Sequence, residues 1–206
     1  AVSAIGAFLV RLIGPLTSKR HIAETGLRTA FPEKSDAEIK ALMKAQWDNL
    51  GRTFGEFSLT HRLKPFDEDS RITIKGIEHF KANQPAIVLS GHFANWEVMA
   101  TVLTQSDHTV HITYRKVNNP LIDARVREQR EAYGTKFLVK KSTHAGGREL
   151  IEALKAGESV AILNDQKFNT GLEVPFFGRP AMTAQGAVRL ALKTGKPLLP
   201  MAVTRD

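Results

Sequence analysis

The sequence predicts an α/β fold: a mostly parallel central sheet flanked by helices and preceded by N-terminal helices. From residue 71 onward, short strand-like runs alternate with helical patterns, which is the rhythm of a parallel sheet covered on both faces. The run at 86–89 is continuously apolar and stops at Ser-Gly-His, which is typical of a buried strand that ends in a tight turn. The length of 206 residues and the hydrophobic content of 42% suit one domain with a substantial core.

The residues ahead of the sheet are predicted to be helical. Ser-Asp-Ala-Glu at 35–38 has the pattern of a capping box, and apolar side chains then recur at helical spacing. Gly51 and Gly55 in this stretch leave room for the close approach of another helix. We therefore divide one structural domain into an N-terminal helical, membrane-proximal region over 1–64 and an α/β core over 65–206.

The chain opens on an apolar stretch, but residues 1–16 are few and are interrupted by Arg11, Gly14 and Pro15. No apolar run reaches the roughly 18 residues of a complete transmembrane helix. Residues 1–16 could lie in a membrane interface, with the basic residues at 19–21 on the cytoplasmic side, or could pack as an ordinary amphipathic helix. Because the chain begins without methionine, we expect a fragment of a longer protein.

The core is expected to follow a regular order. Its strands are predicted at 71–75, 86–89, 109–114, 135–139, 159–163 and 198–203, and its helices at 77–82, from 96 onward, and at 121–133, 146–156 and 184–194. Asn119 and Pro120 are residue types that cap and open a helix. Pro200 cannot donate a ladder hydrogen bond, which places its strand at an edge or a bulge. Residues 168–179 are expected to form a long loop.

Composition narrows the chemistry. The chain has no cysteine, which excludes disulfides, thiol catalysis and cysteine-ligated zinc. Its formal net charge of +8 attracts nucleic acid, anionic lipid or an acidic protein partner. No arginine-rich arm, RNA-binding aromatic signature or zinc spacing is found, so nothing selects nucleic acid. A phosphorylated lipid, an anionic membrane and an acidic carrier protein would all be served by this charge.

His92 and Glu97 are the polar residues that follow the central strand. Residues five apart on one helix lie roughly 140° apart, so the two side chains would not meet within a helix. If His92 lies in the turn before the helix, its ring can fold back and Glu97 can accept the ring N–H. A neutral, oriented imidazole is what a general base for a hydroxyl needs. The alternative is a polar strand-end histidine beside a surface glutamate.

Two further strand ends carry charged groups. Arg115 follows the strand 109–114, where a cation could hold a phosphate or a developing oxyanion, or could simply be solvated. Asp165 follows the strand 159–163 and could orient Arg115 or the substrate, or could bond its own loop backbone. The Phe-Phe pair at 176–177 suits contact with an acyl chain or a membrane, or could cover the core.

Two motifs resemble a known family. Gly-His-Phe-Ala-Asn-Trp-Glu at 91–97 resembles the His-x4-Asp/Glu motif of the glycerolipid acyltransferase superfamily, and its Asn-Trp-Glu form is similar to the lauroyl/myristoyl late acyltransferases of lipid A biosynthesis. Asn-Asp-Gln at 164–166, followed by Val-Pro-Phe-Phe-Gly at 174–178, is a second match. The Phe-Pro-Glu-Gly block usual in glycerolipid acyltransferases is absent, which favours the lipid A branch. The resemblance covers roughly 16–205 and implies a glycerolipid-acyltransferase-like fold. It also implies that the expected fragment is missing an upstream membrane anchor.

The resemblance also implies a reaction and its participants. A fatty acyl group would pass from an acyl-carrier-protein thioester to a hydroxyl of a lipid A precursor, at the cytoplasmic face of the bacterial inner membrane. His92 would be the general base and Glu97 its partner, with no metal and no cofactor besides the donor substrate, acyl-ACP or acyl-CoA. The expected partners are the acyl carrier protein, the lipid A precursor and the membrane surface. The substrate-binding residues would be Asn95, Arg115, Asn118, Asp165, Gln166, Phe176, Phe177 and Gly178.

Two other functions stay open at this stage. The same His92–Glu97 chemistry could acylate another glycolipid or a lysophospholipid. A non-catalytic protein that binds anionic lipid would need the +8 charge and the apolar Phe176–Phe177 loop, but would not need His92. Replacing His92 by alanine distinguishes the two classes, because binding would survive in the second and turnover would be lost in the first.

Overall fold

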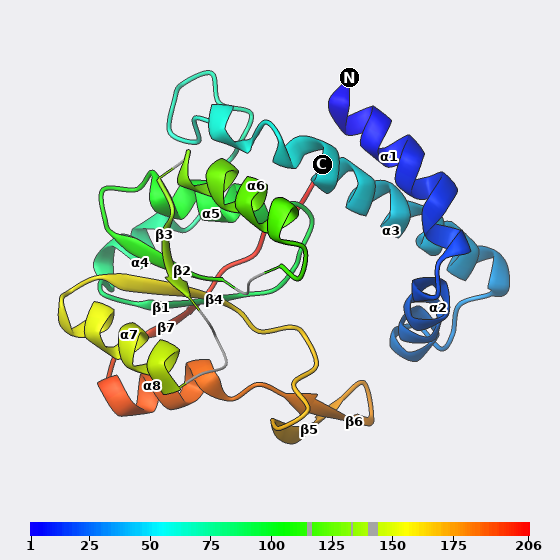
Figure 1. The fold of residues 1–206 in the computed structure, drawn as a ribbon. Helices are drawn as coiled ribbons and strands as arrows, with labels where there is room; N and C mark the ends of the chain where they lie inside the picture. The colour runs from blue at the N-terminus through cyan, green and yellow to red at the C-terminus, as the bar shows by residue number, and fades with distance from the viewer. Residues whose placement is uncertain (115–116, 133, 140–143) are drawn as a thin grey trace. The chain divides into compact units, whose positions relative to one another are not determined.

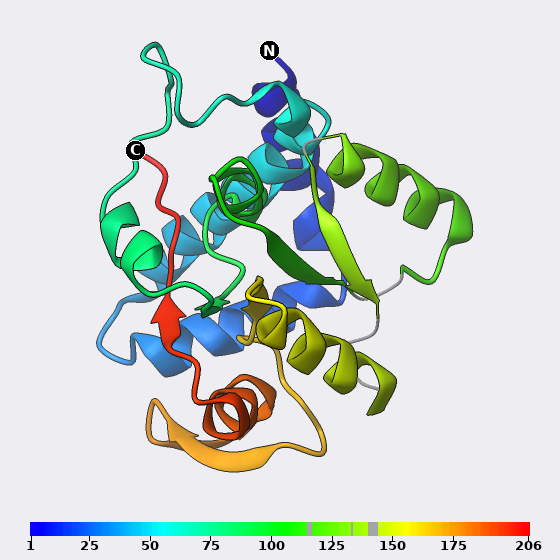
Figure 2. The same ribbon diagram turned by 90° about the vertical axis from the view of Figure 1, so that its left-hand side faces the viewer.

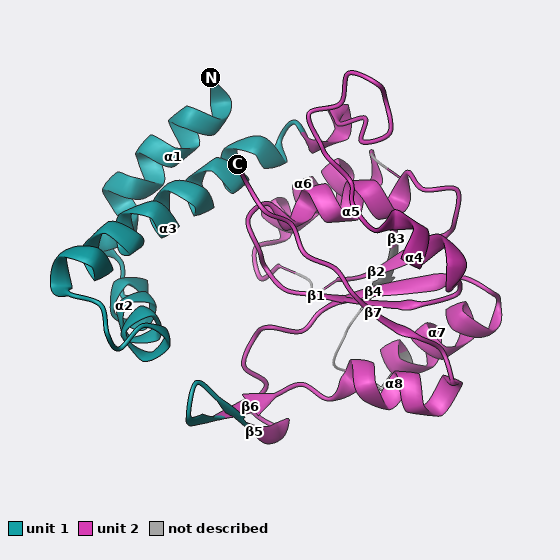
Figure 3. Cartoon of the chain, turned by 180° about the vertical axis from the view of Figure 1, so that it is seen from behind, with its two compact units in different colours: residues 1–59, 175–180 teal, residues 60–174, 181–206 magenta. Residues whose placement is uncertain are grey.

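The computed structural model of the chain describes residues 1–114, 117–132, 134–139 and 144–206. The chain divides into two compact units, which Figure 3 shows in different colours: residues 1–59 with 175–180, and residues 60–174 with 181–206. The first unit is helical and the second holds the α/β core. The chain first passes from one unit to the other between residues 59 and 60. The division expected from the sequence lies between residues 64 and 65.

The first unit is built mainly from helices. They are α1 (Val2–Ile13), η1 (Gly14–Leu16), α2 (Lys19–Ala30) and α3 (Asp36–Phe57), labelled in Figure 1 except for η1. The predicted capping box is confirmed at the start of α3. The Ser35 hydroxyl accepts from the Glu38 N–H at 3.4 Å, and the Glu38 carboxylate accepts from the Ser35 N–H at 2.9 Å. These bonds satisfy two donors that a helix N-terminus would otherwise leave unpaired.

Helix α1 packs on α3 through three glycines. A Cβ atom on Gly51 would lie 2.3 Å from the Gly6 carbonyl oxygen, and one on Gly55 would lie 2.6 Å from the Val2 carbonyl oxygen. A Cβ on Gly6 would in turn lie 2.2 Å from the Gly51 oxygen. The two backbones therefore meet at a distance that only glycine permits, which confirms the expectation for Gly51 and Gly55.

Replacing Gly51 by valine is expected to lower the free energy of unfolding of this helix pair by about 1–3 kcal/mol, because the added carbons overlap the backbone of α1. Urea unfolding followed by circular dichroism measures the change. Gly26 on α2 is the matched control, since a Cβ there meets nothing within 4 Å. Gly26→Ala should leave stability unchanged or raise it slightly. A Gly51→Val protein as stable as wild type would contradict the packing described.

Most large apolar side chains of α1 are exposed. Within the described residues no single helix is long and apolar enough to span a membrane; Val2–Leu16 and Lys19–Ala30 meet the criterion only as a pair, which is bent by 93°. The exposed apolar residues of α1 and η1 are Val2, Ile5, Phe8, Leu9, Leu12, Ile13 and Leu16. Arg11 and the basic residues at 19–21 lie within or next to this surface.

The second unit contains a five-stranded, wholly parallel sheet, which confirms the predicted fold class (Figures 1 and 2). Its strands are β1 (Ile87–Ser90), β2 (Val110–Tyr114), β3 (Lys136–Val139), β4 (Ser159–Leu163) and β7 (Leu198–Pro200), in the order β3-β2-β4-β1-β7. Pro200 lies on the edge strand, as predicted. The strand predicted at 71–75 was wrong: a short alternation of apolar and charged residues forms a strand only where a neighbouring strand completes its hydrogen bonds.

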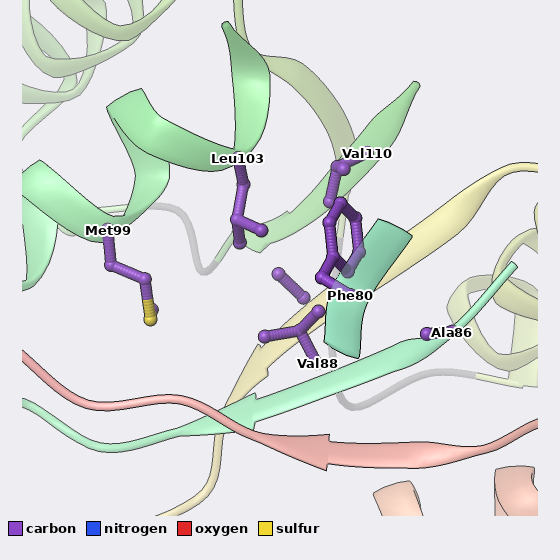
Figure 4. Packing of buried hydrophobic residues seen from close by; sticks show 7 residues of the cluster. Phe80, Ala86, Val88, Met99, Leu103 and Val110 are labelled. Carbon is purple, nitrogen blue, oxygen red and sulfur yellow. The ribbon is translucent and has the colours of Figure 1, made fainter. Parts of the chain in front are cut away.

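The helices of this unit are η2 (Thr60–Arg62), α4 (Ile77–Ala82), α5 (Trp96–Thr104), α6 (Pro120–Glu131), α7 (His144–Lys155) and α8 (Gly186–Thr194). Asn119 caps α6 with Pro120 at its first position, as predicted. The side chains of the strands alternate between the two faces of the sheet. On one face, Val88 packs with Phe80 of α4 and with Met99 and Leu103 of α5 (Figure 4).

The opposite face is covered by α7 and α8. Ile87 of β1 and Val160 of β4 pack there with Leu154 of α7 and Leu190 of α8. After β1 the chain therefore enters α5 on one face, and after β4 it continues to α8 on the other. The neighbouring strands β1 and β4 form a topological switch point, and ligands of open α/β sheets bind at the carboxyl ends of such strands.

The segment predicted as a long loop instead forms a β-hairpin, with β5 (Leu172–Phe176) paired to β6 (Arg179–Thr183). Phe177 and Gly178 connect the strands with φ values of 48° and 71°. Two consecutive residues with positive φ fit the right-handed twist of a hairpin, and this explains Gly178. A bulky residue such as Phe177 rarely adopts this backbone conformation.

Candidate active site

The turn after β1 places His92 at the switch point. Gly91 has little space around it, because a Cβ there would lie 3.0 Å from the Phe93 ring and 3.1 Å from the Asp165 Cβ. Ala94 then adopts a positive φ of 41°, and the Asn95 side chain accepts a hydrogen bond from the Glu97 N–H at 3.2 Å. Helix α5 begins at Trp96, directly after Asn95. His92 therefore lies in the turn ahead of the helix.

His92 forms two bonds to Asp165, which follows β4. Its ring Nδ1 lies 2.8 Å from Asp165 Oδ1, and its backbone N–H donates to Oδ2 at 2.8 Å. Because an ionised carboxylate only accepts, it favours the tautomer with the proton on Nδ1 and the lone pair on Nε2. The His92 side chain is 31% exposed and that of Asp165 is 36% exposed. The arrangement is an oriented imidazole that a substrate can reach.

Electrostatics keep Asp165 ionised. Partial burial raises the pKa of its carboxyl group, but hydrogen bonds from the backbone N–H and the ring of His92 lower it by more, so the net pKa is below the ordinary aspartate value. The folded state thus favours the charged carboxylate. An acceptor that stays charged near neutral pH is what the proposed tautomer requires.

The predicted pairing of Glu97 with His92 is corrected by the geometry. The carboxylate bonded to His92 Nδ1 is that of Asp165, whereas Glu97 accepts from the Trp96 indole N–H at 3.0 Å and from Arg130 Nε at 3.1 Å. Glu97 lies in the first turn of α5 with only 4% of its side chain exposed, and it faces α6, which carries Arg130. The first turn of α5 therefore directs Glu97 toward Arg130, and Asp165, which follows β4, supplies the carboxylate for His92.

Arg130 is not part of a solvated helix face, although it lies on a helix rich in charged residues. Its side chain is 20% exposed, and its guanidinium bonds both oxygens of Glu97. The partners are 33 residues apart, so no local pattern signals the pair. A second link joins β2 to α6, since Asp123 accepts from the Tyr114 hydroxyl and from the Val117 N–H.

The other predicted site residues are spread over the chain. Asn95 is buried and caps α5, while Asn118 and Gln166 are exposed beside the ends of β2 and β4. The hairpin tip, in the first unit, consists of Phe176, Phe177 and Gly178. The two phenylalanine rings pack edge to face, with their centroids 4.6 Å apart. Arg115 lies outside the described residues.

An apolar hollow of about 400 Å³ opens at the carboxyl ends of β1, β4 and β7. Leu89, Phe93, Pro200 and Met201 contribute to its lining, together with Asp165. The Ser90 hydroxyl donates to the Met201 carbonyl at 2.6 Å and holds the segment after β7 beside β1. The hollow therefore places apolar surface directly beside the carboxylate that orients His92.

The described residues contain no group of three or more histidine, aspartate or glutamate side chains arranged to hold a metal ion. The groups that these residues bring to the site are the His92 imidazole, the carboxylates of Asp165 and Glu97, and the Arg130 guanidinium.

The fold and the site define an α/β protein with a carboxylate-bonded histidine at the topological switch point of its sheet. Over its whole length, residues 1–206, the chain matches the family described as bacterial lipid A biosynthesis acyltransferase, and it belongs to that family. It is also similar to phosphatidylinositol mannoside acyltransferase from two strains of Mycobacterium tuberculosis, CDC 1551 and H37Rv, each 27% identical over 169 residues. The matches cover 77% of this chain and 53% of each relative, so the chain spans about half the length of these curated relatives.

Proposed function

We propose that the protein transfers a fatty acyl group from an acyl-carrier-protein thioester to a hydroxyl of a lipid A precursor. The observation that carries the proposal is the His92–Asp165 pair beside an apolar hollow at the ends of β1, β4 and β7. The pair supplies an oriented base, the hollow offers room for a hydrocarbon chain, and the family supplies the reaction class. Acyl-CoA is the alternative donor.

The reaction begins with the acceptor hydroxyl near His92 Nε2. The hydroxyl oxygen bonds to the thioester carbonyl carbon while its proton passes to Nε2, and Asp165 stabilises the imidazolium that forms. The tetrahedral oxyanion then collapses, the carbon–sulfur bond breaks, and the departing thiolate takes the proton from the imidazolium. No covalent enzyme intermediate is formed, in keeping with a chain that has no cysteine.

The oxyanion needs hydrogen-bond donors, and the turn around Gly91 is one source of backbone N–H groups. The His92 N–H is already bonded to Asp165 at 2.8 Å, so it is not the donor in this arrangement. Arg115, which follows β2 in the sequence and lies outside the described residues, is a second proposed donor.

The family and the two relatives support different acceptors. A lipid A precursor is supported by the family, and another glycolipid is supported by the two relatives, which are named as phosphatidylinositol mannoside acyltransferases. Both acceptors present a hydroxyl to the same base. A lysophospholipid is a third acceptor for the same chemistry.

A mass-spectrometric transfer assay tests the function. The full-length protein is reconstituted in membranes with acyl-loaded carrier protein and an under-acylated lipid A precursor, and parallel samples contain a mannosylated phosphoinositide or a lysophospholipid. One added acyl mass on the lipid A precursor is the expected result. Transfer to another acceptor would replace the proposed substrate. Absence of transfer to all of them, with binding to anionic lipid retained, would favour the non-catalytic lipid-binding protein.

We also propose that the protein works at the cytoplasmic face of the bacterial inner membrane. The exposed apolar surface of α1 and the net charge of +8 support binding to an anionic bilayer. Binding to phosphatidylglycerol vesicles in a co-sedimentation assay should weaken several-fold as salt is raised. Leu12→Glu should weaken it further, whereas Leu192→Glu, at an 81% exposed site on α8, should not. Binding that depends on neither salt nor Leu12 would contradict this proposal.

A further inference from the structure

We infer that Glu97 is a positioning residue that acts on His92 through the indole of Trp96, with Arg130 holding Glu97 in place. The inference deepens the proposed function, since it concerns the group that orients the base. It rests on a chain of contacts that runs from α6 through α5 to the turn after β1.

The first contact is between the two rings. The centroid of the Trp96 ring lies 4.9 Å from that of His92, and the planes are inclined at 69°, an edge-to-face arrangement. His92 is therefore restrained on two sides. Asp165 bonds Nδ1, and Trp96 restricts rotation of the ring about that bond.

The second contact fixes the indole. The Trp96 Nε1–H donates to Glu97 Oε1 at 3.0 Å. An indole has one polar atom, so this bond selects the direction in which the ring lies. Glu97 thus determines the position of the ring that packs on His92.

The third contact fixes Glu97. Arg130 Nε lies 3.1 Å from Oε2, Nη2 bonds Oε1, and the Glu97 side chain is only 4% exposed. Moving this carboxylate away from Arg130 would leave a buried charge uncompensated, which is strongly unfavourable. Arg130 therefore holds Glu97 in the position that supports the indole. The direction of His92 Nε2 depends on Glu97 indirectly, through the Trp96 ring.

A double-mutant cycle tests the coupling. Glu97→Gln and Trp96→Phe should each lower kcat for acyl transfer by up to about 10²-fold with little change in KM, because misplacing a base costs rate rather than binding. If Glu97 acts through Trp96, the double variant should be no slower than the slower single variant. Effects that multiply would show that Glu97 acts on His92 by another route and would overturn the inference. Trp96→Phe leaves the Glu97–Arg130 pair intact, so it remains informative if Glu97→Gln fails to fold.

Fluorescence gives a readout that does not require activity. The chain has two tryptophans, so Trp47→Phe leaves Trp96 as the single tryptophan, which is excited selectively over the two tyrosines. Trp47 lies in α3, and its indole N–H has no hydrogen-bond partner among the described residues. A protonated imidazole in contact with an indole quenches its emission. Emission should therefore fall on acidification, and His92→Ala should abolish that change.

Glu97→Gln in the Trp47→Phe protein distinguishes failure of this inference from failure of the proposed function. The expected result is a reduced pH-dependent quenching, because the amide offers one uncharged acceptor oxygen to the donors of Trp96 and Arg130 and so holds the indole less firmly against His92. Quenching identical to that of the Trp47→Phe parent in a folded Glu97→Gln protein would overturn the inference. If the protein shows no acyl transfer at all, fluorescence still tests the contacts among Glu97, Trp96 and His92. Failure of the proposed function is therefore recognised separately from failure of this inference.

Discussion

Replacing His92 by alanine is expected to slow acyl transfer by about 10²–10⁴-fold, because the imidazole that takes the proton of the attacking hydroxyl is then missing. The measurement is the single-turnover rate of acyl appearance on the acceptor. His79→Ala is the matched control, since His79 is a histidine of α4 with 79% of its side chain exposed and should be dispensable. Lipid binding by the His92 variant should equal that of wild type.

The outcome for His92 separates an enzyme from a lipid-binding protein. Transfer by His92→Ala at a rate near that of wild type would contradict the mechanism. Loss of transfer together with loss of folding would be recognised by circular dichroism, and His92→Gln would then repeat the test with a side chain closer in size.

Asp165→Asn is expected to slow transfer by about 10²–10⁴-fold, although the residue exchanges no proton with the substrate in the proposed mechanism. The amide presents one acceptor and one donor where the carboxylate presents two acceptors, so it can no longer receive both His92 bonds, and the favoured tautomer is lost. The same transfer assay measures the effect. Asp67→Asn, at an exposed site, is the control. A rate of transfer within twofold of wild type would contradict the role of Asp165 in orienting His92.

The contribution of Asp165 should also carry a pH signature. Its folded-state pKa is lowered, so the stability that it contributes is fully present above the unfolded carboxyl pKa of about 3.9 and is lost as pH falls through the lower folded value. The difference in unfolding free energy between wild type and Asp165→Asn should be constant above about pH 5 and shrink below about pH 4. A difference that grows on acidification would contradict the stated direction of the pKa.

Much of the fold follows from local patterns in the sequence. The capping box at Ser35, the Asn119–Pro120 helix start and the apolar strand that ends in Gly91 are signals read within a few residues, and the structure has each of them. The edge position of Pro200 follows from its missing N–H. Such features depend on neighbours along the chain and so are visible without the fold.

The hairpin at β5 and β6 shows a signal that was present but missed. Leu172, Val174 and Phe176 alternate with other residues, and a two-residue turn ending in Gly178 follows. Phenylalanine at the first turn position hid the pattern, because asparagine, aspartate or glycine is expected there.

The partners within the site depend on strand order, which the sequence does not reveal. Asp165 reaches His92 only because β4 pairs with β1, although the two residues are 73 positions apart. A motif that contains both His92 and Glu97 suggests a direct pair, yet the first turn of α5 directs Glu97 to Arg130 on another helix. The sequence motif singled out His92 and Glu97, and the three-dimensional arrangement assigned their contacts.

The central claim is that Asp165 holds the imidazole proton on Nδ1 and leaves Nε2 of His92 as the base. Nitrogen-15 NMR of histidine-labelled protein at alkaline pH tests it most directly, with the His92 signals among the seven histidines assigned by their absence from His92→Ala. We predict a protonated Nδ1 and an unprotonated Nε2 in wild type, with this preference lost in Asp165→Asn. A proton on Nε2 of wild-type His92 would contradict the account.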